Sequence, residues 1–274
     1  MEARIETDLY SIAFDGRRGG AITSLFAKSL GKEFVDPSHD RLFNEYRGYF
    51  IEEKQWFSSA DGLVRFAVVE NGPVRVKLQM AGGIGGHPFS CTITASQGQR
   101  RIDFLFAMGF KKETYIGEEV HIKPEERRAQ RRKGHHDGRY KLQAFFPALL
   151  KASTLHKNAA YDVCKSRLGN TYFQSWDEIK HNIILNWVDV ADEAQDMGLG
   201  LLSDHTTAYT HGPDHPLALV LGWGGEGGSW WGMCALRDPQ EAAYALVPHA
   251  GNWDGAGLSE ECARWSEPLL AQRM

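Results

Sequence analysis

The chain of 274 residues has few cysteines and no long apolar segment. Its four cysteines are widely scattered and form no C-x-x-C pair, which argues against a structural zinc site. No apolar run approaches the roughly 20 residues that a membrane-spanning helix requires. The first residues also lack the apolar core of a signal peptide. We therefore predict a soluble, cytoplasmic protein with buried free thiols and no membrane partner.

A strong charge of one sign is also missing. The 31 Lys and Arg residues are set against 35 Asp and Glu residues, giving a net charge of −4 that draws the chain to neither nucleic acid nor anionic membrane. The most charged stretch, residues 111–141, mixes both signs, whereas a nucleic-acid-binding face is basic with interleaved aromatic residues. We predict a solvated insertion at about 111–141 and no nucleic-acid partner.

Motifs of nucleophilic catalysis are absent, since the chain has no G-x-S-x-G and no cysteine with a catalytic signature. Residues 222–227 fit G-x-G-x-x-G, but the aromatic, strand-like residues that follow are not typical of a phosphate-binding helix, so we interpret them as a hairpin loop. A metal-binding cluster is an open alternative, because imidazole and carboxylate both suit zinc. The spacing of its residues along the chain, however, matches no known pattern of a structural zinc site. Its members would be Asp204, His205, His211, Asp214 and His215.

What the sequence does contain is β periodicity. Ile5–Phe14 alternates with a period of two, which predicts a strand. Further strand-like segments recur about every ten residues and are separated by Gly-, Pro- and Asn-containing turns, as in sandwiches and barrels. We find no fixed repeat and no Pro- or Ser-rich linker. We predict a single all-β domain over residues 1–274, built as a large antiparallel β super-sandwich.

A stretch near the end of the chain places chemically useful side chains together. A short strand, Tyr244–Val247, is predicted to stop at Pro248, because proline cannot donate to a sheet ladder. His249, Trp253 and Asp254 then follow in a glycine-containing loop, where functional residues concentrate. The alternative is a capped strand end with the indole in the core.

Tryptophans are numerous in the strand-like regions. Flat indole faces with hydrogen-bonding neighbours suit sugar rings, whose C–H faces pack on the aromatic ring. The alternative for each of them is a place in the core. The tryptophans concerned are Trp176, Trp187, Trp223, Trp230, Trp231 and Trp253.

Five segments together carry a more specific pattern. Gly19–Lys28 is similar to a G-G-x-I-x-S-L-x-D-K run, and Val69–Arg75 to an E-x-G-P-x-R strand pair. Asn186–Asp192 and then Gly200–Asp204 are similar to W-V-D-L-S-D followed by G-V-x-L-L-N-D. Tyr244–Trp253 is similar to Y-A-L-Y-P-H-x-G-D-W. In this order, the segments resemble the C-terminal region of glycoside hydrolase family 38, the α-mannosidases.

The resemblance implies a β-sandwich of the galactose-mutarotase-like kind and an N-terminal α/β catalytic domain as its partner. That domain carries the Asp nucleophile and an essential zinc, with the motif H-x-H-x-D-P-G-W, which this sequence lacks. We therefore expect the catalytic domain on the same or a companion chain, with no cofactor and no catalytic residue in this one. The implied carbohydrate-binding candidates are Asp204, Tyr209, His249 and Trp253, with their neighbours His205 and Asp254.

Departures from the family pattern leave the sugar and linkage open. Ala27 replaces the usual Asp before Lys28, and residues 222–225 replace an L-R-S-P segment whose Arg could touch substrate. We expect a non-catalytic domain that supports the catalytic domain and walls its sugar cleft. The alternatives are a free-standing carbohydrate-binding module and an aldose-epimerase-like enzyme, in which a His acid and a carboxylate base would act on the ring oxygen and the anomeric hydroxyl.

Overall fold

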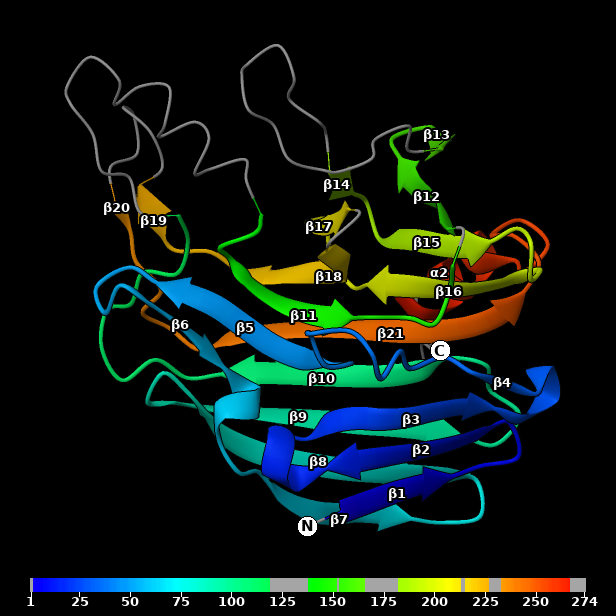
Figure 1. Ribbon diagram of the computed structural model, residues 1–274, viewed down its shortest axis with the longest axis horizontal. Coiled ribbons are helices and arrows are strands. Elements are labelled where there is room, and N and C mark those ends of the chain that lie inside the picture. Colours follow the sequence, from blue (N-terminus) through cyan, green and yellow to red (C-terminus); the bar gives the residue numbers. More distant parts are fainter. Residues whose placement is uncertain are drawn as a thin grey trace, which may run out of the picture.

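Two layers of antiparallel strands make up the molecule (Figure 1). The computed structural model describes residues 2–118, 138–151, 153–165, 182–212, 215–226 and 233–266. One layer is a nine-stranded sheet, and the other consists of a four-stranded and a six-stranded sheet. The β-bridges Ile22–Phe43 and Val35–Ala148 tie these two smaller sheets together. The predicted all-β super-sandwich is confirmed.

Most of the strands belong to three main sheets. The four-stranded sheet contains β1 (Glu2–Glu6), β2 (Tyr10–Asp15), β3 (Ala21–Ala27) and β4 (Lys32–Glu33). The nine-stranded sheet contains, in spatial order, β13 (Asp162–Lys165), β12 (Ser153–Ala159), β15 (Trp187–Asp192), β16 (Met197–Ser203), β21 (Gln240–Ala250), β10 (Ile102–Met108), β9 (His87–Ser96), β8 (Arg75–Ile84) and β7 (Arg65–Asn71). The six-stranded sheet contains β14 (Ile183–Ile184), β17 (Thr207–Gly212), β18 (His215–Gly222), β11 (Leu142–Phe146), β5 (Glu45–Phe50) and β6 (Gln55–Ser58). The remaining elements are β19 (Gly225–Glu226), β20 (Met233–Cys234), the 3-10 turns η1 (Gly16–Arg18), η2 (Lys28–Leu30) and η3 (Ser59–Asp61), and the helix α2 (Leu258–Ser266).

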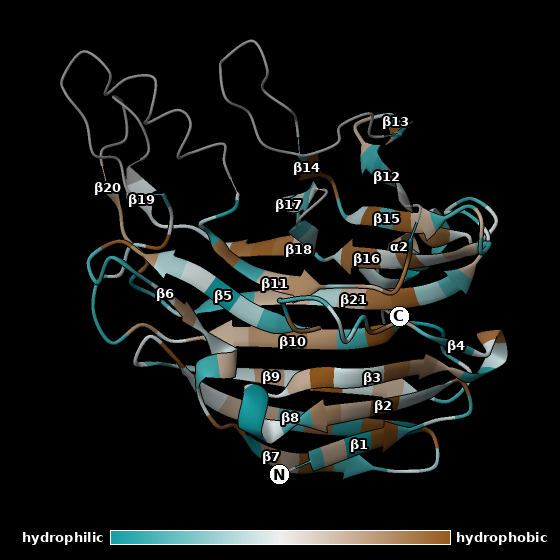
Figure 2. Ribbon diagram, in the orientation of Figure 1, coloured by the Kyte–Doolittle hydropathy of each residue, from teal (hydrophilic) through white to brown (hydrophobic). Residues whose placement is uncertain are grey.

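Strand alternation builds the core between the layers. In β9 and β10 every second residue is buried, and these residues are mostly large and apolar. They pack against buried side chains of β2, β3, β5 and β11 in one continuous cluster. Figure 2 shows β10, β11 and β18 as largely hydrophobic along their length. The burial of these apolar faces holds the two layers together.

A buried ring of hydrogen bonds also joins the two layers. Asn44 Nδ2 donates to the Tyr46 hydroxyl (3.1 Å), which lies 2.8 Å from the Tyr244 hydroxyl, and Tyr244 donates to Asn44 Oδ1 (2.6 Å). All three side chains are fully buried, and burial raises the pKa of both tyrosines well above the ordinary value. Both hydroxyls therefore stay protonated and can donate. Asn44 has a left-handed backbone (φ 62°), which asparagine tolerates better than most residues.

The single strand predicted over Ile5–Phe14 is in fact a hairpin. β1 ends at Glu6, and β2 begins at Tyr10. The side chain of Thr7 makes the turn, because its hydroxyl accepts hydrogen bonds from the backbone N–H groups of Leu9 (3.3 Å) and Tyr10 (3.0 Å). Such hydroxyl–backbone bonds compete with a continuous ladder, and the period of two could not reveal them.

The strand predicted over Tyr244–Val247 is longer than the sequence suggested. β21 has 11 residues and includes Pro248 and His249, so the prediction that Pro248 ends the strand is wrong. β21 pairs with β10 only as far as Leu246, whereas its pairing with β16 continues to the end of the strand. Beyond Leu246 one flank has no partner among the described strands, and a proline whose nitrogen faces that flank removes no ladder hydrogen bond.

The helix α2 packs on the outer face of the nine-stranded sheet, and the sequence analysis did not predict it. It forms a second apolar cluster with residues of β15, β16 and β21. Two glycines of β16 provide the space. A Cβ atom on Gly200 would lie 2.8 Å from the Leu258 side chain, and one on Gly198 would lie 2.3 Å from the His249 ring. Glycine is required at both positions by close packing rather than by backbone angles.

The insertion predicted over residues 111–141 is described only in part. Thr114 and Ile116 form β-bridges with other parts of the fold, and Ile116 is fully buried. The solvated stretch therefore does not begin at residue 111, because these side chains complete the edge of the core. Residues 119–137 lie outside the described residues. That residues 1–274 form one domain stays a prediction.

The predictions of free thiols and of no membrane-spanning helix can be checked in the residues that the structure describes. No helix within them has both the length and the apolar character that a bilayer crossing requires. All four cysteines are described, and none is in a disulfide. Cys91 and Cys262 are buried as predicted, whereas Cys164 is only half-buried and Cys234 is exposed.

Replacing Tyr244 by Phe tests the buried ring of hydrogen bonds. The variant leaves the Asn44 carbonyl and the Tyr46 hydroxyl short of a partner, so we expect the free energy of unfolding to fall by about 1–3 kcal/mol. Urea denaturation measures this change. Tyr161, which is fully exposed, provides the matched control, and Tyr161→Phe should leave stability unchanged. An unchanged midpoint for Tyr244→Phe would contradict the assigned role.

Replacing Gly198 by Ala tests the packing of His249 against β16. The added methyl group must displace the imidazole, and we expect a loss of about 1–3 kcal/mol from overpacking. Gly62→Ala is the control, because a Cβ atom at Gly62 would meet nothing within 4 Å and its φ is −139°. Equal denaturation midpoints for the two variants would show that His249 is not packed as described.

Candidate functional site

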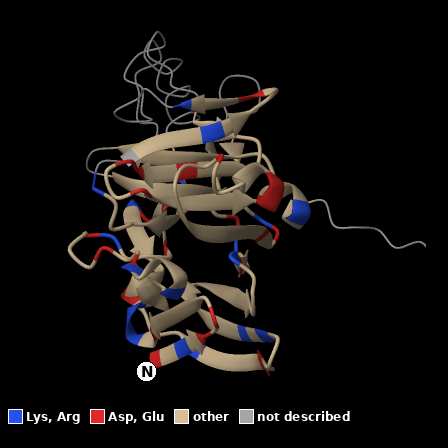
Figure 3. Ribbon diagram, turned by 90° about the vertical axis from the view of Figure 1, so that its right-hand side faces the viewer, with Lys and Arg blue, Asp and Glu red and all other residues tan. Residues whose placement is uncertain are grey.

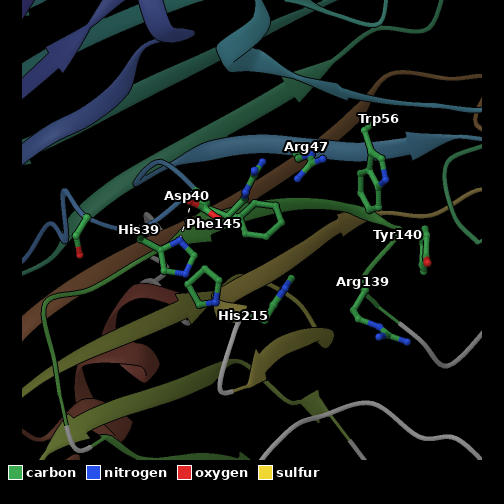
Figure 4. Close-up of a pocket in the computed structure, with 11 residues that line it drawn as sticks. His39, Asp40, Arg47, Trp56, Arg139, Tyr140, Phe145 and His215 are labelled. Carbon is green, nitrogen blue, oxygen red and sulfur yellow. Dashed lines mark hydrogen bonds between the residues drawn. The ribbon is translucent and has the colours of Figure 1, made fainter.

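A groove of about 560 Å³ lies on the face of the six-stranded sheet that is turned away from the core. We call it the outer groove. Side chains converge on it from the loop before β5, from β5 and β6, from the segment that leads into β11, and from the start of β18 (Figure 4). Its lining residues are Ser38, His39, Asp40, Arg41, Arg47, Trp56, Arg139, Tyr140, Phe145, His215 and Pro216.

The alternation of β5 decides which side chains reach the outer groove. Tyr46 and Phe50 are fully buried in the core, so Arg47 and Tyr49 point to the opposite face. The neighbouring strands bring further residues onto this face, since Trp56 of β6 is opposite Tyr49. The outer groove is therefore made by the same strand that carries part of the core.

Three side chains form a stacked ladder along one end of the groove. The Arg47 guanidinium carbon lies 4.4 Å from the centre of the Trp56 ring. The Trp56 ring in turn stacks on Tyr140, with centroids 5.3 Å apart and an interplanar angle of 25°. Figure 4 shows Trp56 between Arg47 and Tyr140. The aromatic rings fix the plane of the guanidinium without using its N–H groups.

A buried carboxylate fixes a second arginine. Glu45 is 2 % exposed, and its Oε1 lies 3.1 Å from Arg41 Nη1 and accepts a 2.7 Å hydrogen bond from the Ser58 hydroxyl. Its Oε2 accepts from the backbone N–H of Leu42 at 2.9 Å. Glu45 is therefore fully engaged in positioning Arg41. A second hollow of about 360 Å³ adjoins the outer groove here and shares Arg41, Arg47, Trp56 and Asp40 with it.

A short relay of hydrogen bonds holds His215 at the other side of the groove. Gln143 Nε2 donates to the Thr210 hydroxyl at 2.6 Å, and the same hydroxyl lies 2.7 Å from His215 Nε2. The His215 ring also meets Phe145 edge-on, at 5.4 Å between centroids. Gln143 and Thr210 are fully buried, so the imidazole is hydrogen-bonded to side chains that are themselves fixed in the core. The outer groove thus combines aromatic side chains with fixed hydrogen-bonding groups, which is a lining typical of small-molecule pockets.

The sequence-predicted residues Asp204 and His205 lie together but away from the other candidates. Both are exposed, and His205 Nδ1 lies 2.5 Å from Asp204 Oδ1. Asp204 follows β16 beside Ala243, whereas His249 lies beside Gly198 near the other end of that strand. Six residues of β-strand separate the two places by about 20 Å.

His249 is part of a buried pair rather than an exposed loop. Its Nε2 lies 2.9 Å from Asp189 Oδ1, and both side chains are almost completely buried. His156, whose Cα is the cross-strand partner of Asp189, approaches from β12. Burial lowers the pKa of His156, although the Asp189 carboxylate opposes this shift. The pair joins strands β15 and β21 across β16.

The remaining candidates fall into different surroundings. Trp253 is half-buried and stacks on Trp187 at 5.6 Å, beside His156. Its neighbour Asp254 is exposed. Tyr209 is fully buried in the core, with Lys157 Nζ 5.7 Å from its ring centre. The structure therefore brings His249 and Trp253 into one region but does not gather the six candidates into one site.

The alternatives raised by spacing can also be placed. Within the described ranges, no three His, Cys, Asp or Glu side chains converge as metal ligands. The suggested metal-binding cluster is not assembled by its described members, and Asp214 lies outside the described residues. The G-x-G-x-x-G segment was predicted to be a hairpin loop, but Gly222 ends β18 and Gly225–Glu226 form β19, which pairs with β20, so only residues 223–224 of its described part lie between strands. Trp176, Trp230 and Trp231 lie outside the described residues.

The residues of the outer groove were missed in the sequence. They come from separate segments of the chain and match no motif. One signal was present, because Glu45–Phe50 alternates buried and outward residues and a tryptophan follows in the next strand. That alternation could have assigned Arg47 and Trp56 to one outward face, but not the loop residues that complete the groove.

The comparisons with known proteins concern the fold. No protein-family model and no curated protein matches the chain. An α-mannosidase from Enterococcus faecalis V583 superposes with a TM-score of 0.67 at 14% identity, over 97% of this chain and 31% of that chain. A glycosyl hydrolase family 38 protein from Enterococcus faecalis gives a TM-score of 0.67 at 13% identity, over 97% and 32%. The α-N-acetylgalactosaminidase NagBb from Bifidobacterium bifidum gives 0.55 at 8% identity, over 97% and 39%. The chain thus spans about a third of the length of these proteins, and at such identities the likeness is one of fold.

Proposed function

We propose that this chain acts as the non-catalytic, C-terminal-type domain of a family-38-like α-mannosidase, and that its outer groove contacts the sugar. The observation that carries the proposal is the superposition with the Enterococcus faecalis α-mannosidase, which covers 97% of this chain but 31% of the enzyme. A fold that occurs as part of a larger hydrolase fits a supporting domain. The partner would be an α/β catalytic domain, which would also supply the zinc.

The carboxylates of the outer groove support a non-catalytic role. A retaining glycosidase needs two carboxyl groups about 5–5.5 Å apart, one as nucleophile and one as acid/base. Asp40 is the carboxylate among the described lining residues. In the adjoining hollow, Glu45 is occupied by Arg41 and Ser58, and Asp61 accepts a 2.7 Å hydrogen bond from the Ser58 N–H. The described part of the chain therefore presents no such pair at the groove.

The other lining residues support contact with carbohydrate. Tyr140 is half-buried and offers an apolar ring face, which its stacking on Trp56 holds in place, and the arginines and histidines around it offer donors to hydroxyl oxygens. A sugar needs both kinds of contact, because its ring has apolar C–H faces and polar edges. The same groove would serve a free-standing carbohydrate-binding module, so activity and binding have to be measured separately.

One observation favours an aldose-epimerase-like enzyme as a second candidate. His39, His215 and Asp40 line the same groove, and such an enzyme needs an imidazole acid and a carboxylate base near one ring. A mutarotation assay on α-glucose or α-galactose distinguishes the two functions. Turnover that is lost in His215→Gln would favour the epimerase over a supporting domain.

The purified chain should not hydrolyse 4-nitrophenyl α-mannoside, with or without added zinc. The expected reason is the lack of a nucleophile and acid/base pair across the sugar. Release of nitrophenol is followed by absorbance, with a complete family 38 enzyme as positive control. Hydrolysis by the chain alone, at a rate above the buffer blank, would refute the non-catalytic assignment.

Binding of α-mannobiose should depend on Trp56 and not on Trp253. We expect Trp56→Ala to weaken binding about tenfold or more, because Trp56 holds both Arg47 and Tyr140 in place at the groove. Calorimetric titration or saturation-transfer NMR measures the affinity, and circular dichroism checks the fold. Trp253→Ala is the matched control. The reverse result, with only Trp253 required, would move the sugar to the region of His249.

A further inference from the structure

The outer groove holds an arginine whose donors are not used by the protein. Arg47 is half-buried and contacts the Trp56 ring, yet its guanidinium makes no hydrogen bond or ion pair with any residue that the structure describes. A guanidinium carries five N–H donors in a fixed fork that matches carboxylate, sulfate and phosphate oxygens. The stacked ring fixes its plane and leaves the edge of the fork open. In this arrangement the guanidinium can bind an anionic group without breaking a hydrogen bond within the protein.

The charges around Arg47 point the same way. The groove lining contains three arginines and two histidines against one aspartate, in a chain whose net charge is −4. In the adjoining hollow Arg18 adds a fourth arginine, and Glu45 and Asp61 add two carboxylates. On the face shown in Figure 3, acidic and basic residues are also interspersed. The two hollows together hold four arginines against three carboxylates, a small excess of positive charge that favours anions.

The neighbouring guanidinium groups of Arg41 and Arg47 repel each other. Burial lowers the pKa of Arg47, and the neighbouring Arg41 guanidinium lowers it further, although Glu45 and Asp61 oppose the shift. Glu45 already pairs with Arg41, so it does not neutralise both arginines. An anion bound between the ladder and Arg41 would relieve this repulsion. The free energy gained in this way is specific to charged ligands.

We propose that the outer groove selects carbohydrates that carry an anionic substituent, with Arg47 binding the phosphate, sulfate or carboxylate group and Tyr140 and His215 contacting the sugar ring. This inference rests on the proposed contact between the groove and carbohydrate. It adds the class of ligand, which is an anionic carbohydrate rather than a neutral mannoside. Arg47 would then be a specificity-determining residue of the groove.

The test compares four ligands on the 274-residue chain by calorimetric titration: mannose, mannose 6-phosphate, mannuronate and inorganic phosphate. We expect the two anionic sugars to bind at least about tenfold more tightly than mannose, because a charge-assisted bidentate contact is added. Mannose 6-phosphate and mannuronate distinguish a phosphate-bearing from a carboxylate-bearing ligand. Their affinity should fall as NaCl is raised, since partly exposed charges are screened.

Two variants assign the effect to Arg47. Arg47→Gln should bring the affinity for the anionic sugars down to that for mannose, because the charge-assisted contact is lost, so the ratio of the two affinities is the readout. Arg47→Lys should retain part of the preference, since it keeps the charge but not the fork. Arg65→Gln, at an exposed site on β7, is the matched control for charge and should bind as the wild type does.

Three outcomes would overturn the inference, and only the third would also reject the proposed contact with carbohydrate. Equal affinity for mannose and its anionic derivatives would reject anion selection while leaving carbohydrate binding intact. Inorganic phosphate binding as tightly as mannose 6-phosphate would reject recognition of the sugar. If none of the four ligands binds, both the inference and the carbohydrate contact are rejected.

Discussion

The hydrogen-bonded ring of Asn44, Tyr46 and Tyr244 fixes strand β5 against β21 at the centre of the sandwich. Side chains on a strand alternate between two faces, so a shift of one residue would exchange every one of them. While Tyr46 stays bonded to Tyr244, Arg47 must point outward and Gly48 inward. The buried contact thus positions the groove on the opposite face, although the two share no side chain.

A second buried contact gives a physical meaning to the sequence resemblance. Asp189 belongs to the segment similar to W-V-D, and His249 belongs to the segment similar to Y-A-L-Y-P-H. The structure joins these segments by the 2.9 Å contact between Asp189 and His249, across the glycines of β16. The shared residues can therefore be explained by the packing of three strands and α2. Their role in binding sugar stays a prediction.

The period-two pattern was sufficient for the fold class, and for several strands it was close to the observed bounds. It failed where a side chain competes with the ladder, as Thr7 does at the first turn. It failed again at Pro248, because the effect of a proline depends on which flank of the strand is paired. The helix α2 was missed because it has only nine residues and packs on the sheet at Gly200, a contact that a period-two strand pattern cannot reveal.

The site was harder to predict than the fold. Its side chains come from segments as far apart as His39 and His215, and only the sheet order brings them together. Alternation in β5 could have shown that Arg47 points outward. It could not have shown that Trp56 and Tyr140 stack beneath it, since that requires the positions of β6 and of the segment that enters β11.

If the outer face of the six-stranded sheet is the carbohydrate surface of this protein, a ligand must be found there. A crystal structure with mannose 6-phosphate soaked into the lattice tests this most directly. We expect density for the phosphate within hydrogen-bonding distance of the Arg47 guanidinium, with the sugar ring along Tyr140. Density for the ligand beside Trp253, with the outer groove empty, would contradict this assignment.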